Sequence, residues 1–280
     1  MPNSAPSKID QTFQRLKAAN RAAFIPFYVA GDPDLQTSEA LIRAAAEQGA
    51  DLVEIGVPFS DPIADGPVIQ AAFHRALTKG FKVRQIFELT RNLRASGVSV
   101  PLVAMVSYSL VYKQSLAAFL KFAKEAGFDG LIIPDLPAGY EGDAAERARA
   151  AGLDLIFLIA PTTTAERRNI IAKRSRGFIY YISIAGITGA RAALPSDLAE
   201  NVRDIKSRTA LPVCVGFGIS RPEQAAAVCG VADGAIVGSA LVRRSEEAVA
   251  RNLSGAALVE YVTALAGELA EAAHKRQFKI

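Results

Sequence analysis

One acidic residue interrupts an apolar run in the first quarter of the chain, and a loop of unusual composition follows it. The run is 52–55, with Glu54 inside it, and the loop 56–67 is rich in proline and glycine and carries Asp61 and Asp65. Burying a carboxylate without a partner is costly, so a glutamate in an apolar strand requires a reason. A buried carboxyl has a raised pKa and can exchange protons near neutral pH. The stretch therefore indicates either acid–base catalysis by Glu54 or a structural ion pair between Glu54 and a Lys or Arg.

Glycines in the last third of the chain have the arrangement of an anion site. Gly216 and Gly218 are two residues apart, and Gly238 precedes Ser239 at the expected start of a helix. Glycine lets the backbone approach an anion closely, and a helix N-terminus offers free N–H groups and a favourable dipole. Together with Gly189, these residues predict a phosphate-binding site. The alternative is that the glycines only form turns.

Few other side chains are suited to proton transfer or metal binding. His74 lies on the polar face of an expected helix and His274 is near the C-terminus, so neither is predicted to be catalytic and no metal site is expected. Tyr180 and Tyr181 are adjacent in an expected strand, and because side chains alternate along a strand, the two must face opposite sides. Acid–base chemistry therefore falls to carboxylates, with a tyrosine as a further candidate.

Eight short apolar segments alternate with helical patterns along the chain. Continuous apolar strands are typical of a parallel sheet buried on both faces, and eight βα units predict a (β/α)8 TIM barrel. We expect one domain over residues 1–280, with an extra N-terminal helix and additional helices. An open doubly wound sheet is the weaker alternative, because no G-x-G-x-x-G follows the first strand. The expected strands are 24–30, 52–55, 102–106, 131–133, 155–159, 178–182, 213–215 and 235–237.

The barrel would bring the candidate residues together. Active sites of such barrels lie at the carboxyl ends of the strands, and the loops after the seventh and eighth strands often bind phosphate. Glu54, Asp65, Asp135 and the late glycine loops all fall at that end. This shared location favours a functional interpretation of Glu54 and of the glycines.

Composition argues against several other classes of protein. The chain has 280 residues, 50% of them hydrophobic, and a formal net charge of +4. It has no long Lys/Arg run and no aromatic-basic pattern, which argues against nucleic-acid binding. Cys214 and Cys229 lack metal-ligand spacing and are expected to be free thiols in a reducing cytoplasm. No secretory signal is visible, and no apolar run reaches the ~18 residues expected of a membrane span.

Five motifs resemble those of one known family. Residues 54–67, EIGVPFSDPIADGP, closely resemble the signature of the tryptophan synthase α subunit. The stretches 134–137 (PDLP) and 186–189 (GITG) resemble its loop four and its mobile loop six, and 216–220 (GFGIS) and 238–240 (GSA) resemble its phosphate loops. The resemblance covers nearly the whole chain in order, and the first motif alone is highly specific.

The resemblance implies a TIM-barrel lyase that cleaves indole-3-glycerol phosphate to indole and D-glyceraldehyde 3-phosphate, a retro-aldol step of tryptophan biosynthesis. By this resemblance Glu54 is the main acid–base residue, Asp65 faces the indole N–H, and Tyr180 helps to hold the substrate and Glu54. The other implied site residues are Gly189, Gly218, Gly238 and Ser239 at the phosphate, and Phe27 and Phe217 in the indole pocket.

The resemblance also implies a partner. The family works with a tryptophan synthase β subunit in an α2β2 complex, and pyridoxal phosphate is expected only in that subunit. For this chain no cofactor, metal, nucleic acid or membrane is expected, and its location would be cytoplasmic. A non-catalytic regulatory subunit, another phosphate-binding barrel enzyme such as an isomerase, and a free-standing lyase remain as alternatives.

Two stretches depart from the family pattern. Residues 107–110 read SYSL, where many relatives carry a Tyr-Asn-Pro-like run, and Ile184 stands where some relatives have arginine. Substrate contacts at the first stretch, and closure of the loop 185–194 near the second, must therefore depend on other residues.

Overall fold

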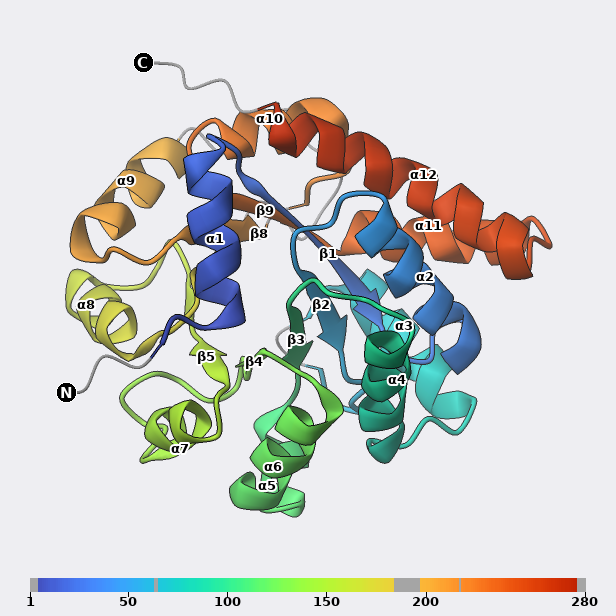
Figure 1. Ribbon diagram of the computed structural model, residues 1–280, viewed down its shortest axis with the longest axis horizontal. Helices are drawn as coiled ribbons and strands as arrows, with labels where there is room; N and C mark the ends of the chain where they lie inside the picture. The colour runs from blue at the N-terminus through green and yellow to red at the C-terminus, as the bar shows by residue number, and fades with distance from the viewer. Residues whose placement is uncertain (1–4, 63–64, 184–196, 217, 276–280) are drawn as a thin grey trace.

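The strands form one sheet that closes into a barrel, with helices around its outside (Figure 1). The computed structural model describes residues 5–62, 65–183, 197–216 and 218–275. All strand pairs are parallel, as the alternation of strands and helices predicts. The TIM-barrel fold predicted from the sequence is confirmed.

Strands and helices alternate along most of the described chain. The strands are β1 (Ala23–Val29), β2 (Val53–Gly56), β3 (Leu102–Met105), β4 (Gly130–Ile132), β5 (Asp154–Ile156), β6 (Leu158–Ile159), β7 (Ile179–Ile182), β8 (Val213–Gly216) and β9 (Gly234–Val237). The helices are α1 (Lys8–Ala18), α2 (Leu35–Glu47), α3 (Pro67–Thr78), α4 (Arg84–Ala95), α5 (Tyr108–Lys113), α6 (Leu116–Ala126), α7 (Ala144–Ala150), α8 (Ala165–Arg174), α9 (Leu198–Arg208), α10 (Pro222–Cys229), α11 (Ser239–Ala250) and α12 (Gly255–His274). No helix in the described part of the chain is long and apolar enough to cross a lipid bilayer.

The barrel closes through one interrupted strand. The strand order in the sheet is β5-β4-β3-β2-β1-β9-β8-β7-β6, so β5 and β6 lie at its two ends. These two are consecutive pieces of the strand predicted over 155–159, separated at Phe157. Because β5 pairs with β4 and β6 pairs with β7, this strand joins both ends of the sheet. The prediction of one continuous strand here is wrong, although the number of barrel positions is the predicted eight.

Apolar side chains fill the barrel interior near the amino ends of the strands, and α1 covers that end. Ile25, Val103 and Phe178 of the barrel pack in one cluster with Ile9 and Phe13 of α1. The rings of Phe13 and Phe178 are 5.9 Å apart between centroids. The predicted N-terminal helix therefore closes the amino end of the barrel, and the carboxyl ends of the strands form the opposite face.

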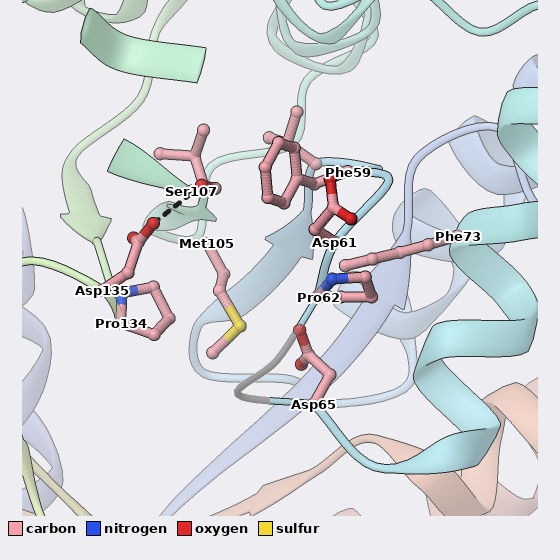
Figure 2. A pocket seen from close by; sticks show the side chains of 11 residues that line it. Phe59, Asp61, Pro62, Asp65, Phe73, Met105, Ser107, Pro134 and Asp135 are labelled. Carbon is pink, nitrogen blue, oxygen red and sulfur yellow. Dashed lines mark hydrogen bonds between the residues drawn. The ribbon is translucent and has the colours of Figure 1, made fainter. Parts of the chain in front are cut away.

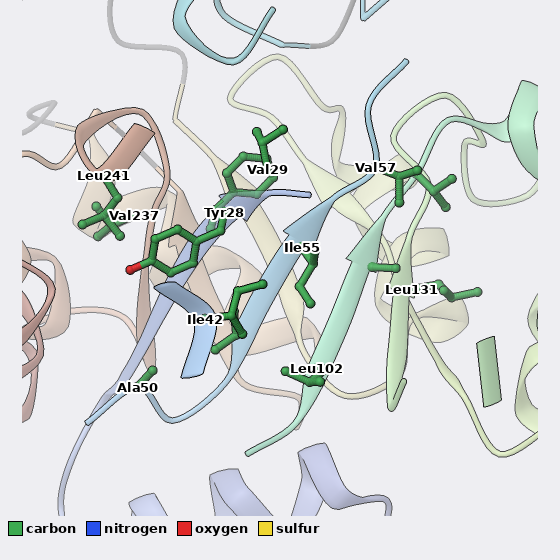
Figure 3. Close-up of a cluster of buried hydrophobic side chains, with 14 of the residues drawn as sticks. Tyr28, Val29, Ile42, Ala50, Ile55, Val57, Leu102, Leu131, Val237 and Leu241 are labelled. Carbon is green, nitrogen blue, oxygen red and sulfur yellow. The ribbon is translucent and has the colours of Figure 1, made fainter. Parts of the chain in front are cut away.

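A second apolar layer lies between the strands and the surrounding helices (Figure 3). Tyr28, Ile55 and Leu131 belong to this outer layer. Strands that are apolar on both faces are typical of parallel sheets. All four residues of β2 are buried, and Glu54 is among them.

Helix α3 is an extra helix that brings the loop after β2 against the barrel. It packs on β1 and α11. A Cβ placed on Gly56 of β2 would lie 2.4 Å from Phe27 Cζ and 3.1 Å from Phe73 Cε1 of α3. Because no side chain fits at Gly56, these two rings can approach the strand, and α3 can lie close to the carboxyl end of the barrel.

Candidate active site

Glu54 is a buried acidic residue with no hydrogen-bond partner among the described residues. It lies in β2, in register with Phe27 of β1 and Val103 of β3. The residue is 1% exposed, and within the described part of the chain neither carboxylate oxygen has a hydrogen-bond partner. Burial, and then the nearby charge of Asp65, raises the pKa of Glu54 to about 8. The alternative interpretation of Glu54 was a structural ion pair, and none is formed with any described Lys or Arg. With this pKa the carboxyl is largely protonated at neutral pH.

Asp65 is positioned by the start of α3. Its N–H donates to the Pro62 carbonyl at 3.1 Å, and the side chain of Gln70 donates to the Asp65 carbonyl at 2.8 Å. Gly66 is the N-cap of α3 and Pro67 is its first residue, so the helix begins two residues after Asp65. Partial burial raises the pKa of the Asp65 carboxyl to about 6. At neutral pH Asp65 is therefore mainly ionised, whereas Glu54 is mainly protonated.

Tyr180 faces the barrel interior from β7. It packs beside the interior cluster, whereas Tyr181 belongs to the outer layer, so the structure decides between the two tyrosines. A Cβ placed on Gly216 of β8 would lie 2.5 Å from the Tyr180 hydroxyl oxygen, which means that the ring crosses over that glycine. Burial, and then the charges of Glu54 and Asp65, raises the pKa of Tyr180 well above its usual value. The three residues predicted to do the chemistry therefore lie within electrostatic reach of one another.

A mainly apolar pocket opens beside Asp65 at the carboxyl end of the barrel (Figure 2). It encloses about 380 Å³, including open solvent at its mouth. Phe59, Phe73 and Met105 contribute apolar walls. Of the predicted site residues that the structure describes, Asp65 lines this pocket, and so does Asp135, which the sequence placed at the same end of the barrel. The rings of Phe27 and Phe73 both lie close to Gly56. The sequence did not predict Phe73 and Met105 as site residues, because an apolar residue in a helix or a strand is expected to belong to the hydrophobic core.

Polar groups lie on the far side of the pocket from Asp65 (Figure 2). The Ser107 hydroxyl donates to Asp135 Oδ2 at 2.8 Å, and the Tyr108 N–H donates to Asp135 Oδ1 at 2.7 Å. This contact joins the loop after β4 to the start of α5. The sequence departure at 107–110 therefore begins at Ser107, a residue of the pocket wall.

The predicted anion site is described in part. Gly238 is the N-cap of α11 and Ser239 is its first residue, with no side-chain cap on the helix. A Cβ on Gly238 would lie 3.2 Å from Phe27 Cδ1, which places this helix start beside the Phe27 ring. Gly218 is exposed, and a Cβ there would meet no atom of the described residues within 4 Å. The predicted residues Gly189 and Phe217 lie outside the described residues.

Comparison with known proteins agrees with this geometry. A family model described as tryptophan synthase alpha chain matches residues 13–274. The chain belongs to this family. Members of the tryptophan synthase alpha chain family are lyases that catalyse the indole-3-glycerol phosphate cleavage step of tryptophan biosynthesis. The resemblance seen in the sequence is thereby confirmed.

Individual relatives support the same assignment. The tryptophan synthase alpha chain of Rhodopirellula baltica is 48% identical over 251 residues, which cover 89% of this chain and 90% of the relative. That of Geobacter sulfurreducens is 44% identical over 92% of this chain and 97% of its own length. Among solved structures, the alpha chain from Legionella pneumophila superposes with a TM-score of 0.87 at 34% identity, covering 96% and 97% of the two chains. A chain of Mycobacterium tuberculosis tryptophan synthase also gives 0.87, at 36% identity over 96% and 99%.

No group of three metal-ligating side chains is close enough to hold a metal ion, as far as the described residues extend. The described part of the site offers two carboxyls, which lose their protons at different pH values. A protonated carboxyl and an ionised one, placed beside an apolar pocket, can donate a proton to one atom of a ligand and accept one from another.

Proposed function

We propose that this chain performs the family's reaction through Glu54 and Asp65, by retro-aldol cleavage of indole-3-glycerol phosphate to indole and D-glyceraldehyde 3-phosphate. The observation that carries the proposal is the pair of raised pKa values, about 8 and about 6, on two carboxyls that face one interior. Divergent pKa values in neighbouring carboxyls are the usual mark of an acid and a base with separate roles. The apolar pocket next to Asp65 has the chemistry that an indole ring requires.

Glu54 is the acid–base residue in this proposal. Its protonated carboxyl donates a proton to C3 of the indole while Asp65 accepts the N1 proton, which produces the indolenine tautomer. The C3 bond to the glycerol carbon then breaks, and its electron pair returns to the ring as Asp65 gives the proton back to N1. The ionised Glu54 takes the proton of the glycerol hydroxyl, whose carbon becomes the aldehyde. Both carboxyls thus end the cycle in their starting states.

Other residues bind and orient the substrate. Tyr180 holds the substrate against Glu54, and Phe27, with Phe217, contributes to the indole pocket. The phosphate is bound by Gly218, Gly238 and Ser239, together with Gly189. Support comes from the start of α11, where free N–H groups and the helix dipole favour an anion. The reaction requires no cofactor or metal in this chain.

The chain would act with a partner. We propose that it forms an α2β2 complex with a tryptophan synthase β subunit in the cytoplasm, that pyridoxal phosphate belongs to that subunit, and that neither nucleic acid nor a membrane is involved. The chain itself would be a single TIM-barrel domain over residues 1–280. Indole is small and apolar, so its transfer to a docked partner would limit its escape into solution.

The test is to mix the purified chain with indole-3-glycerol phosphate and to follow indole release, first alone and then with a tryptophan synthase β chain. A rise in turnover together with co-elution supports both the activity and the partner. Full turnover without a complex at micromolar concentrations would mark a free-standing lyase. No indole release under either condition would overturn the proposed activity.

A further inference from the structure

Arg75 joins three elements at the carboxyl end of the barrel. It lies on α3, and its Nε and Nη2 donate to the two carboxylate oxygens of Asp32, each at 2.9 Å. Its Nη1 donates to Glu246 of α11 at 3.3 Å. Asp32 lies in the loop between β1 and α2, and its side chain is 4% exposed. One guanidinium group therefore connects α3, this loop and α11.

The helices that Arg75 connects begin at different parts of the candidate site. α3 starts two residues after Asp65, and its Phe73 forms a wall of the pocket. α11 starts with Ser239, directly after Gly238, where the phosphate is proposed to bind. The contacts of Arg75 thus link the helix of the indole part to the helix of the phosphate part, through a buried carboxylate of Asp32 and an exposed one of Glu246.

The same loop is bonded to the C-cap of α3 and lies close to the helix at Gly31. The Lys79 ammonium donates to the Pro33 carbonyl at 2.6 Å. Gly31 has a φ of +83°, and a Cβ there would lie 3.6 Å from Ala76 Cβ of α3. These contacts involve only the loop after β1. Helix α3 also packs directly on α11, and the ion pair between Arg75 and Glu246 adds a polar link to that packing.

We propose that Arg75 is a positioning residue for the lyase reaction, because it holds the indole part and the phosphate part of the site at the separation that one substrate molecule requires. The inference rests on the proposed function. Arg75 touches no reacting atom in this proposal and acts through Asp32 and Glu246. A displacement of about 1 Å between parts of a site can cost on the order of 100-fold in rate, so a brace of this kind affects catalysis.

The experiment compares Arg75→Gln, Arg75→Lys and the double variant Arg75→Met/Asp32→Asn. In the double variant Asp32 is replaced together with Arg75, so no unpaired carboxylate is left buried. The matched control is Arg94→Gln at the other end of the barrel. Arg94 donates to the carbonyls of Val98, Val100 and Gly127 and to Asp129, so it is also a multiply bonded arginine. All variants are assayed well below their melting temperatures, which circular dichroism supplies.

Three quantities are measured for each variant. The first is kcat/KM for indole-3-glycerol phosphate. The second is the Kd of 3-(indol-3-yl)propyl phosphate, which spans both parts of the site but lacks the hydroxyls needed for cleavage. The third is the Kd of inorganic phosphate, which occupies the phosphate part alone.

For Arg75→Gln and for the double variant we expect kcat/KM to fall about tenfold or more. The affinity for the propyl phosphate should fall to a similar extent, because the two parts of the site are no longer held at the correct separation. The affinity for inorganic phosphate should stay within about twofold, since each part remains intact. Arg75→Lys should be intermediate, because an ammonium cannot make the paired contact of a guanidinium. Arg94→Gln should lower the melting temperature and leave all three quantities within about twofold of the parent.

The inference is overturned if the Arg75 variants have lower melting temperatures but keep the kcat/KM and the propyl phosphate affinity of the parent. Arg75 would then stabilise the fold without positioning the site. Failure of the proposed function looks different. A parent that binds the propyl phosphate but releases no indole refutes the activity, while the Arg75 comparison of affinities still decides the positioning role. A parent that neither cleaves the substrate nor binds the analogue refutes both.

Discussion

Glu54, at the carboxyl end of the barrel, and three aspartates at the amino end differ in how their carboxyl groups are bonded. At the amino end, three aspartates each accept the backbone N–H of the neighbouring strand and each pair with a cationic or imidazole side chain. The N–H contacts are Asp51 with Phe24 at 2.9 Å, Asp129 with Leu102 at 3.0 Å and Asp233 with Val213 at 3.0 Å. The side-chain partners are His274 at 2.7 Å, Arg94 at 2.5 Å and Lys206 at 2.8 Å, respectively.

At the carboxyl end, Glu54 has no such partner in the described part of the chain. The titratable groups that interact with it are Asp65, whose charge opposes its ionisation, and Tyr180. A paired carboxylate stabilises the fold by tying strands together, whereas an unpaired one stays protonated and can transfer its proton. The difference between Glu54 and the three aspartates is therefore one between chemistry and stability, and the predictions below test it.

The largest effect is expected from Glu54→Gln. The amide keeps the shape of the side chain but cannot exchange a proton, so turnover of indole-3-glycerol phosphate should fall roughly 10²–10⁴-fold with the fold intact. Steady-state indole release measures the loss, and circular dichroism checks the fold. The control is Asp233→Asn at the amino end, which should keep its turnover. Near-parental turnover by the Gln variant would remove Glu54 from its acid–base role.

For Arg94→Gln we expect the stability of the fold to decrease and turnover to be retained. This change leaves Asp129, whose side chain is 12% exposed, without its main cationic partner. Breaking a largely buried ion pair costs about 3 kcal/mol, so the free energy of unfolding should fall by that order. Urea unfolding measures it, and turnover at 25 °C should stay within about twofold. A large loss of turnover at a temperature where the variant is folded would contradict the division between the two ends.

The pH dependence of the free energy of unfolding should show that Glu54 is buried as a neutral acid. The pKa of Glu54 rises from 4.5 to about 8 on folding, so between these values the native state binds more protons than the unfolded state, and stability falls as pH rises. The parent should lose on the order of 3 kcal/mol between pH 5 and pH 8 relative to Glu54→Gln. Urea unfolding of both proteins at the two pH values measures the difference. Parallel pH profiles would show that Glu54 is not buried as a neutral acid.

The smallest effect is expected from Gly218→Val at the edge of the carboxyl end. A Cβ at this position would meet no atom of the described residues within 4 Å, so we expect little change in the melting temperature. It would obstruct an anion that approaches the backbone, and KM for indole-3-glycerol phosphate should rise about tenfold. The matched substrate is indole-3-glycerol without phosphate, whose weak turnover should be the same in both proteins. An unchanged KM would exclude Gly218 from the phosphate site.

Local pattern accounts for much of what the sequence predicted. A run of apolar residues bounded by turn residues sets a strand, and the position of Glu54 within it sets which face of β2 the carboxyl occupies. The loop before α3 has proline and glycine at positions that start the helix, so the sequence by itself places Asp65 beside a helix N-terminus. The alternation of strands and helices then implies a parallel barrel and its functional end.

Tertiary structure decided what depends on partners distant in the sequence. Which of Tyr180 and Tyr181 faces the interior follows from the register of β7 against β8, and the break at Phe157 follows from closing the barrel between β4 and β7. The contact between Arg75 and Asp32 spans 43 residues, and no local pattern marks it. Side-chain periodicity is set by the backbone of each segment alone, whereas pairing, burial and pKa depend on which segments meet, and only the closed barrel fixes that.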